Sequence, residues 1–237
     1  TSLTKREADL VEVLAHAAAD VDGVAPLSEQ YLLGVRSAGD ADRDDLTHVL
    51  AWSTEAEGAE PAETLIGYGQ LQTSGPAASA EIVVHPQWRR RGVGTRILDA
   101  LPDPIRLWAH GPVPGALEFT TANGLVPVRE LLRMERDLAT PLPPTGVPPA
   151  YRVRPFRPGA DDAAWLSANR DTFAHHLEQG SLTERDLADR MAQDWFDAHG
   201  FLLIVPVDEP GRIAAFHWTK IEPPTSRISE VYAVGVR

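Results

Sequence analysis

The sequence predicts a mixed α/β fold (α+β, with a mixed sheet) arranged as two tandem domains. Short apolar strands and amphipathic helices follow one another up to residue 138, and a similar order of elements begins again after a proline-rich segment. That segment, 139–150 (ATPLPPTGVPPA), contains five prolines. Because proline fixes φ and has no amide hydrogen, neither a helix nor a sheet strand can run through it. We therefore expect an N-terminal domain over 1–138, a semi-rigid linker over 139–150 and a C-terminal domain over 151–237.

Local patterns predict the elements of the N-terminal domain. Apolar residues at helical spacing indicate helices, Ser28 is a plausible N-cap, and Gly124 is a typical helix C-terminal stop. The expected elements, in chain order, are helices over 5–19 and 28–35, strands over 47–53, 64–72 and 80–85, a helix over 92–101, a strand over 105–109, a helix over 117–123 and a strand over 130–138.

The C-terminal domain repeats part of this order. Its expected elements are a strand over 151–156, helices over 161–173 and 182–195, and strands over 201–207, 212–221 and 229–236. This order matches the first half of the N-terminal domain if an early strand there is missing or weak. The repeat is therefore one of topology, because the two halves share little sequence.

The composition limits the classes of function. A net charge of −12 argues against a nucleic-acid partner, since nucleic-acid binders present a basic face. The sequence has no cysteine, which excludes disulfides, thiolate zinc sites and a cysteine nucleophile and fits a reducing cytoplasm. The apolar runs are far shorter than the ~18 residues of a membrane span, and the N-terminus has no signal-peptide core. We expect a cytoplasmic protein without a membrane partner. His175 and His176 are too close for a shared metal on one helix face, so we expect no metal.

Residues 81–95 (EIVVHPQWRRRGVGT) carry the clearest chemical signal. A short strand ends near Val84, a turn follows, and a helix begins within 89–94. Arginines at a helix N-terminus oppose the helix dipole, which favours anions there. Unpaired amides at a helix start, together with arginine side chains, form a pyrophosphate site, and Gly92 and Gly94 let the backbone approach it. The alternative is a basic helix start neutralised by nearby acidic residues. The strand, turn and helix together favour the anion site.

The V-x-P turn followed by R-x-x-G-x-G resembles the coenzyme A signature of the GCN5-related N-acetyltransferase family. The resemblance implies two tandem domains of that fold, the second incomplete, with acetyl-coenzyme A as co-substrate. In that family the strand before the loop splays from its neighbour, and its backbone holds the pantetheine arm. By position, the resemblance assigns cofactor contacts to Ile82, Val83, Val84, Arg90, Arg91, Gly92, Val93, Gly94 and Thr95, and in the second domain to Val234, Gly235 and Val236.

Phrases along nearly the whole chain are similar to the mycothiol synthase family, a two-domain branch of these acetyltransferases. They are VDGVAP with the following SEQ, VVHPQ-x-RRRG, WAHG, LEQG, FHWTK and EVYAVGV. The last two discriminate best, because generic members lack them. The resemblance implies transfer of acetyl to the cysteinyl amine of a cysteine–glucosamine–inositol conjugate, which gives mycothiol.

The resemblance assigns polar substrate contacts to Glu29, Glu178, Lys220 and Glu230. Charged donors and acceptors suit a ligand rich in hydroxyl groups. For Glu29 a surface salt bridge explains the residue equally well. Lys220 and Glu230 are expected beside the core, where unpaired charge is costly. Glu230, near the strand expected to flank the thioester, is the expected general base. We expect direct attack by the amine, no covalent enzyme intermediate and a monomer.

The sequence departs from that family at its end. It stops at Arg237, before the second pyrophosphate loop and the expected general acid, although the C-terminal domain is the one thought to acetylate. The expectation is a fragment, a truncated inactive protein or a protein completed by another chain. Two other functions stay open at this point: a tandem acetyltransferase for another small amine, and an acetyl-coenzyme A binding module without turnover.

Overall fold

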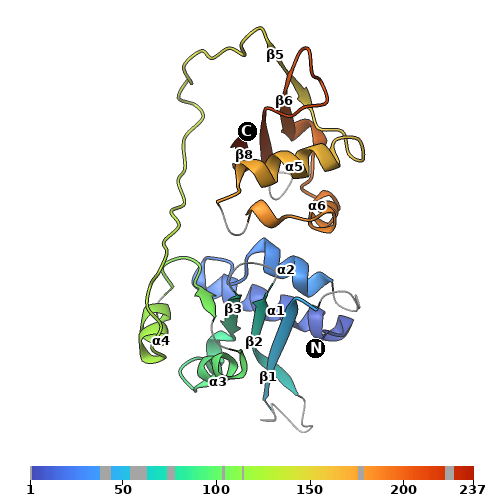
Figure 1. Cartoon of the computed structure of the whole chain (residues 1–237). Coiled ribbons are helices and arrows are strands. Elements are labelled where there is room, and N and C mark those ends of the chain that lie inside the picture. The colour runs from blue at the N-terminus through green and yellow to red at the C-terminus, as the bar shows by residue number, and fades with distance from the viewer. Residues whose placement is uncertain are drawn as a thin grey trace. The chain divides into compact units, whose positions relative to one another are not determined.

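The computed structural model describes residues 2–37, 44–53, 63–73, 78–102, 105–113, 115–175, 179–221 and 227–237. The chain forms two compact units, Thr1–Leu132 and Arg133–Arg237, here the N-terminal and the C-terminal unit. Within these described residues, each unit contains one four-stranded sheet, and Figure 1 shows the helices that accompany each sheet.

The N-terminal unit is a sheet with helices on both faces. Its elements are α1 (Lys5–Asp22), α2 (Glu29–Arg36), β1 (Leu46–Ser53), β2 (Thr64–Gln72), β3 (Ser79–Val84), the 3-10 helix η1 (Pro86–Trp88), α3 (Val93–Ala100), β4 (Arg106–Trp108) and α4 (Ala116–Ala122). The sheet order is β1-β2-β3-β4. The first three strands are antiparallel, whereas β3 and β4 are parallel and are joined through α3.

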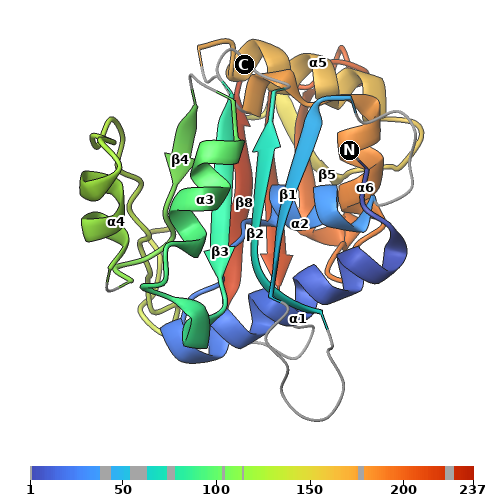
Figure 2. The same ribbon diagram turned by 90° about the horizontal axis from the view of Figure 1, so that it is seen from below.

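Successive side chains of β3 reach opposite faces of the sheet, as a strand requires. Val83 joins the core that α1 and α2 form, whereas Ile82 and Val84 pack against the cluster around Val93 and Ile97 of α3. Figure 2 shows α3 in front of β2 and β3. The helix that follows the predicted site is therefore held on the sheet by its own apolar face.

The helix α1 has clear boundaries. Thr4 and Glu7 form a capping box at its start, and Gly23, with φ 69°, ends it in the left-handed conformation. The buried face consists of small and aliphatic residues, namely Ala8, Val11, Leu14, Ala15 and Ala18. Small residues on this face let the helix lie close to the sheet. Ser28 is the N-cap of α2 as predicted, but its side chain makes no capping hydrogen bond.

Two glycines of β2 set the distance between α3 and the sheet. A Cβ on Gly67 would lie 2.8 Å from side-chain atoms of Ile97 and Val93, and a Cβ on Gly69 would lie 2.5 Å from Ile97 Cγ2. Real Cβ atoms essentially never approach so closely. The absence of side chains at these two positions lets α3 pack directly against β2.

The C-terminal unit is an antiparallel sheet with an aromatic core. Its elements are β5 (Tyr151–Pro155), α5 (Asp162–Thr172), η2 (Gln179–Ser181), α6 (Glu184–Met191), η3 (Ala198–Gly200), β6 (Phe201–Pro206), β7 (Ala215–Ile221) and β8 (Ser229–Val236). The strand order is β5-β6-β7-β8. Trp218 stacks on Phe201 with ring centroids 4.3 Å apart, and Trp165 meets both rings edge-on.

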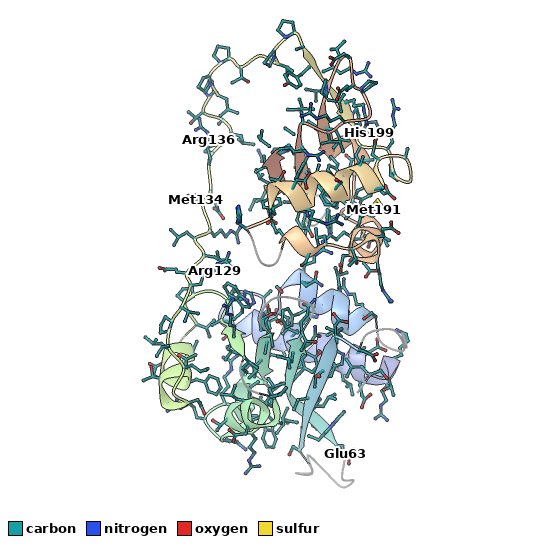
Figure 3. All side chains as sticks on the ribbon, in the orientation of Figure 1. Glu63, Arg129, Met134, Arg136, Met191 and His199 are labelled. Carbon is teal, nitrogen blue, oxygen red and sulfur yellow. The ribbon has the colours of Figure 1, made fainter. Side chains whose placement is uncertain are left out.

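The structure corrects the predicted strand over 130–138. Residues 125–138 form neither helix nor strand, and Leu132 and Met134 are 76% and 88% exposed. Figure 3 marks Arg129, Met134 and Arg136 along this stretch of chain. The alternation of side chains suits a strand, but a strand forms only where a neighbour supplies hydrogen bonds, and no sheet of the described chain includes this segment.

Other boundaries also differ from the prediction, and the helix predicted over 5–19 extends to Asp22. The helix predicted over 182–195 is shorter, because a capping box at Thr183 begins it at Glu184 and the chain turns after Met191. This turn buries Trp195 against Trp218, with ring centroids 5.8 Å apart. The strand predicted over 212–221 begins only at Ala215.

Candidate active site

The candidate donor site lies in the segment that connects β3 to α3. β3 ends at Val84, the His85 side chain accepts a hydrogen bond from the Gln87 amide at 3.3 Å, and η1 completes the turn. Residues 89–92 then lead into α3, which begins at Val93. The predicted order of strand, turn and helix is therefore present.

The β3 strand loses its neighbour just before this turn. Its parallel pairing with β4 covers Ser79, Ala80 and Glu81 only, ending at the pair Glu81–Trp108. Residues 82–84 continue to pair with β2 on the other side. In the part of the chain that the structure describes, this edge of β3 therefore has no strand partner. The Val84 carbonyl accepts a hydrogen bond from Arg89 Nε at 3.2 Å, and the other backbone groups of this edge are available for hydrogen bonds with a ligand.

The backbone of the loop has two residues in the left-handed region. Arg90 has φ 62° and Gly92 has φ 79°. Arg90 is the only non-glycine residue with positive φ among the described residues, and such a conformation is uncommon for an L-residue. Turns of this kind gather amide N–H groups into concavities that bind anions.

The three arginines of the loop have different surroundings. Arg89 donates from Nη1 and Nη2 to both carboxylate oxygens of Asp22, each at 2.7 Å, and from Nε to the Val84 carbonyl at 3.2 Å. The Arg91 guanidinium lies 4.7 Å from the ring centroid of Trp88. Arg90 and Arg91 are exposed, while Arg89 is half-buried. An acidic neighbour of the loop thus exists, and it is paired with Arg89.

The glycines and other loop residues have separate roles. Gly92 needs its positive φ, although a Cβ there would meet nothing within 4 Å. A Cβ on Gly94 would lie 3.1 Å from the Phe119 ring of α4, so this glycine also serves packing. Val93 is buried in the cluster with Ile97, so only its backbone can face a ligand. Thr95 is half-buried in the first turn of α3.

A buried carboxylate lies at the fork between β3 and β4. Glu81 is 1% exposed, and its Oε2 accepts a hydrogen bond from the Ser28 amide at 2.7 Å. His110 Nε2 lies 2.9 Å from Glu81 Oε1. The Glu81 carboxylate raises the pKa of His110, and burial opposes this effect. Sequence reasoning did not single out this pair, although a lone glutamate in the apolar run AEIVVH was a usable signal.

In the C-terminal unit, the three residues assigned by resemblance to the cofactor, Val234, Gly235 and Val236, lie on β8, the last strand in the order β5-β6-β7-β8. The β7–β8 pairing shifts between Trp218 and Thr219, which marks a β-bulge. Val234 and Val236 are exposed, while a Cβ on Gly235 would lie 2.7 Å from both Phe216 and Thr172. Gly235 thus packs under α5, and its two valine neighbours face outward.

The predicted acceptor residues fall into three groups. Lys220 and Glu230 are directly opposite each other in the β7–β8 ladder, so the structure brings them together. Lys220 is 8% exposed, with Nζ 4.8 Å from the Trp195 ring centroid and 5.6 Å from that of Tyr232, whereas Glu230 is exposed. Glu29 begins α2 in the N-terminal unit. Glu178 lies outside the described residues.

Tyr232, which covers Lys220, is itself held by a buried arginine. Arg190 of α6 is 8% exposed and donates from Nε to the Tyr232 hydroxyl at 2.8 Å. Two cationic side chains therefore surround one tyrosine at the bulge of β8. Among the described residues, no group of three His, Cys, Asp or Glu side chains could hold a metal ion, and no helix there is long and apolar enough to cross a bilayer.

Comparison with known proteins relates this geometry to one family. The Acetyltransferase (GNAT) domain family matches residues 49–124, which include β2, β3, the loop and α3. A mycothiol acetyltransferase from Catenulispora acidiphila is 45% identical over 97% of this chain and 77% of its own length. One from Kytococcus sedentarius is 42% identical over 99% of this chain and 75% of its own length.

A solved structure shows the same fold. The crystal structure of a GCN5-related N-acetyltransferase from Sphaerobacter thermophilus aligns with all of this chain and 75% of its own, with a TM-score of 0.61. The two sequences are 22% identical, so this likeness concerns the arrangement of elements only.

Proposed function

The chain belongs to the mycothiol acetyltransferase family, within the GCN5-related N-acetyltransferases, and on that premise we propose that it converts a cysteine–glucosamine–inositol conjugate into mycothiol. The acetyl group comes from acetyl-coenzyme A and is received by the cysteinyl amine. The names of its relatives favour this acceptor over other small amines and favour an enzyme over a binding module.

The loop between β3 and α3 supports the assignment of the acetyl-coenzyme A site. Amides at the start of α3, with the exposed Arg90 and Arg91, suit a diphosphate. The open edge of β3 over 82–84 suits the amide groups of a pantetheine arm. We assign the same role in the C-terminal unit to 234–236 of β8, which form an edge of that sheet. Acetyl-coenzyme A supplies the thioester whose acetyl group is transferred.

The transfer needs no covalent bond to the protein. The amine nitrogen forms a bond to the acetyl carbon, the carbon–sulfur bond breaks and coenzyme A leaves as its thiolate. The nitrogen loses a proton to the general base, and the thiolate takes up a proton to give the free thiol. A free α-amino group has a pKa of about 8, so roughly a tenth is neutral at neutral pH and deprotonation contributes at most about 1.5 kcal/mol. Orienting two bound substrates contributes about 7–11 kcal/mol. We therefore assign most of the rate to binding geometry.

Glu230 is the proposed general base. It is exposed on β8, two residues before the tyrosine at the bulge, so an acceptor amine can reach it. We assign Lys220, opposite Glu230 in the ladder, to the same acceptor by its match to the family, since an ammonium group suits a ligand rich in hydroxyl groups. We assign Glu29 and Glu178 to the same acceptor by their match to the family. We place the reaction in the cytoplasm and expect a monomer.

An acetylation assay tests the proposal. The purified chain is incubated with acetyl-coenzyme A and either the cysteinyl conjugate or a panel of other small amines, and products are identified by mass spectrometry. We expect acetylation of the conjugate and little of the panel. Binding of acetyl-coenzyme A without any product, or equal acetylation of all the amines, would contradict the proposal.

A further inference from the structure

We propose that Asp22 and Arg89 form a clamp that holds the loop between β3 and α3 in its anion-binding shape. Arg89 is then a positioning residue, and it does not itself contact the pyrophosphate. This inference rests on the proposed function, because that function assigns the loop to acetyl-coenzyme A. The Asp22–Arg89 clamp consists of the ion pair between these residues and the hydrogen bond from Arg89 to Val84.

The geometry of Arg89 supports a structural role for its side chain. Its two terminal nitrogens meet the two oxygens of Asp22 at 2.7 Å each, and its Nε reaches the Val84 carbonyl at 3.2 Å. All three guanidinium nitrogens thus have protein partners. The Asp22 side chain is only 8% exposed and that of Arg89 is 31% exposed. A bidentate pair of this kind fixes orientation as well as distance.

The position of Asp22 indicates a specific purpose. It is the last residue of α1, and Gly23 ends the helix. A carboxylate at a helix C-terminus faces the negative end of the helix dipole, which is unfavourable for the helix alone. The bidentate partner on the loop, 67 residues away in the sequence, offsets this disadvantage. The clamp therefore ties the end of α1 to the end of β3 and to the start of the loop.

The clamp acts directly before the unusual backbone of the loop. Arg90, the next residue, has φ 62°, and Gly92 has φ 79°. A non-glycine residue leaves this region readily unless its neighbours hold it. On one side α3 is fixed by its packing on Gly67 and Gly69; on the other side the clamp fixes Arg89. The amide groups between Arg89 and α3 are then ordered before the diphosphate binds, which lowers the entropic cost of binding.

The two roles for Arg89 predict opposite signs for one mutation. If Arg89 bound the pyrophosphate, replacing Asp22 by a neutral residue would release the guanidinium and remove a negative charge near an anion site, so affinity would rise. If the pair is a clamp, the same replacement loosens the loop, so affinity falls. The neutral isostere Asp22→Asn is therefore the informative variant.

Calorimetric titration of the full chain with coenzyme A tests the clamp. We expect Asp22→Asn to bind about tenfold more weakly, the scale of a charge-assisted hydrogen bond, and Asp22→Glu to recover most of the loss. Arg89→Lys keeps the charge but loses the fork and should resemble Asp22→Asn. Combining Asp22→Asn with Arg89→Lys should weaken binding little beyond either change alone, since both remove one interaction.

A matched control is available on the same helix. Glu12 of α1 pairs with Arg36 at 2.8 Å on the surface, so Glu12→Gln is an equivalent change that should leave coenzyme A affinity unaltered. Unfolding temperatures confirm that each variant is folded at the titration temperature. Unchanged or tighter binding by Asp22→Asn, or additive losses in the double variant, would overturn the clamp. If the wild-type chain fails to bind coenzyme A, the proposed donor site fails and the clamp fails with it.

Discussion

The two units have sheets of equal strand number, but their interiors are made of different residues. The N-terminal unit packs mainly aliphatic and alanine side chains, and both units bury some polar residues. The C-terminal unit packs a continuous group of aromatic rings around Trp218. In the first, the buried Glu81 connects β3 to Ser28 at the start of α2, beside the candidate donor site. In the second, ring packing supports the strand pair that carries Lys220 and Glu230.

The comparison shows two ways of fixing a site. The N-terminal unit fixes its loop with directed polar contacts, namely Asp22 to Arg89 and Glu81 to Ser28. The C-terminal unit fixes β7 and β8 mainly by the packing of aromatic rings, to which the hydrogen bond from Arg190 to Tyr232 adds a directed contact. Changes to ring packing should therefore affect stability first, and changes to polar contacts should affect ligand binding first.

The largest expected effect follows from removing the central ring of the C-terminal unit. Trp218→Ala should lower the free energy of unfolding by about 3–5 kcal/mol, since Trp218 is fully buried. Denaturant unfolding followed by circular dichroism measures this loss. Trp52→Ala, at a residue 36% exposed in β1, is the control and should cost well under half as much. Equal losses would contradict the stated difference between the cores.

The second effect concerns the donor loop. Arg90→Ala combined with Arg91→Ala should weaken coenzyme A binding about 100-fold, because two exposed guanidinium groups leave the phosphate site. Calorimetry measures the affinity. Arg152→Ala, at an exposed arginine of β5, is the control with no expected effect. A double variant that binds as well as the wild type would refute the anion site.

A smaller effect is expected at the acceptor site. Glu230→Gln should lower the acetylation rate about tenfold near pH 6 and much less near pH 9, where most of the amine is already neutral. Steady-state rates over this pH range measure the profile, with Glu209→Gln, exposed beyond the end of β6, as the control. A rate that Glu230→Gln leaves unchanged at every pH would exclude the general-base role.

The smallest effect is the pH dependence of the Glu81–His110 pair. Glu81 raises the pKa of His110 in the folded protein, so protonated His110 stabilises the fold below its unfolded pKa of about 6.5. This contribution disappears as the pH rises through the higher folded pKa. His110→Gln should therefore cost stability near pH 6, by less than about 1 kcal/mol because the ring is partly solvated, and nothing near pH 9. Unfolding curves at both pH values give the difference. A cost independent of pH would exclude an ion pair.

Much of the fold could be predicted because it depends on local patterns. The capping residues of α1, the apolar spacing along it and the run of β3 are all contiguous in the sequence. The prediction of a strand over 130–138 was wrong because a strand needs a neighbouring strand to pair with, which a local sequence pattern does not specify. The early end of α6 depends on where Trp195 packs, which is also a tertiary matter.

The donor loop was predicted as a segment, but its contacts were not. Arg89 was grouped with its two neighbours as part of one basic cluster, and its partner Asp22 lies 67 residues earlier. A charged residue at the unfavourable end of a helix was the available signal. The Glu81–Ser28 contact spans 53 residues and involves a backbone amide, which no pattern of side chains reveals.

The lack of a side chain at Gly67 and Gly69 limits the substitutions that this protein tolerates. Neither residue belongs to the loop, yet a methyl group at either would lie less than 3.0 Å from the Ile97 side chain, so that this side chain or α3 would have to shift. In a saturation screen selected for acetyl transfer, these two positions should reject alanine as firmly as the arginines do. These two positions of β2 would then be intolerant of substitution because α3 packs directly against them.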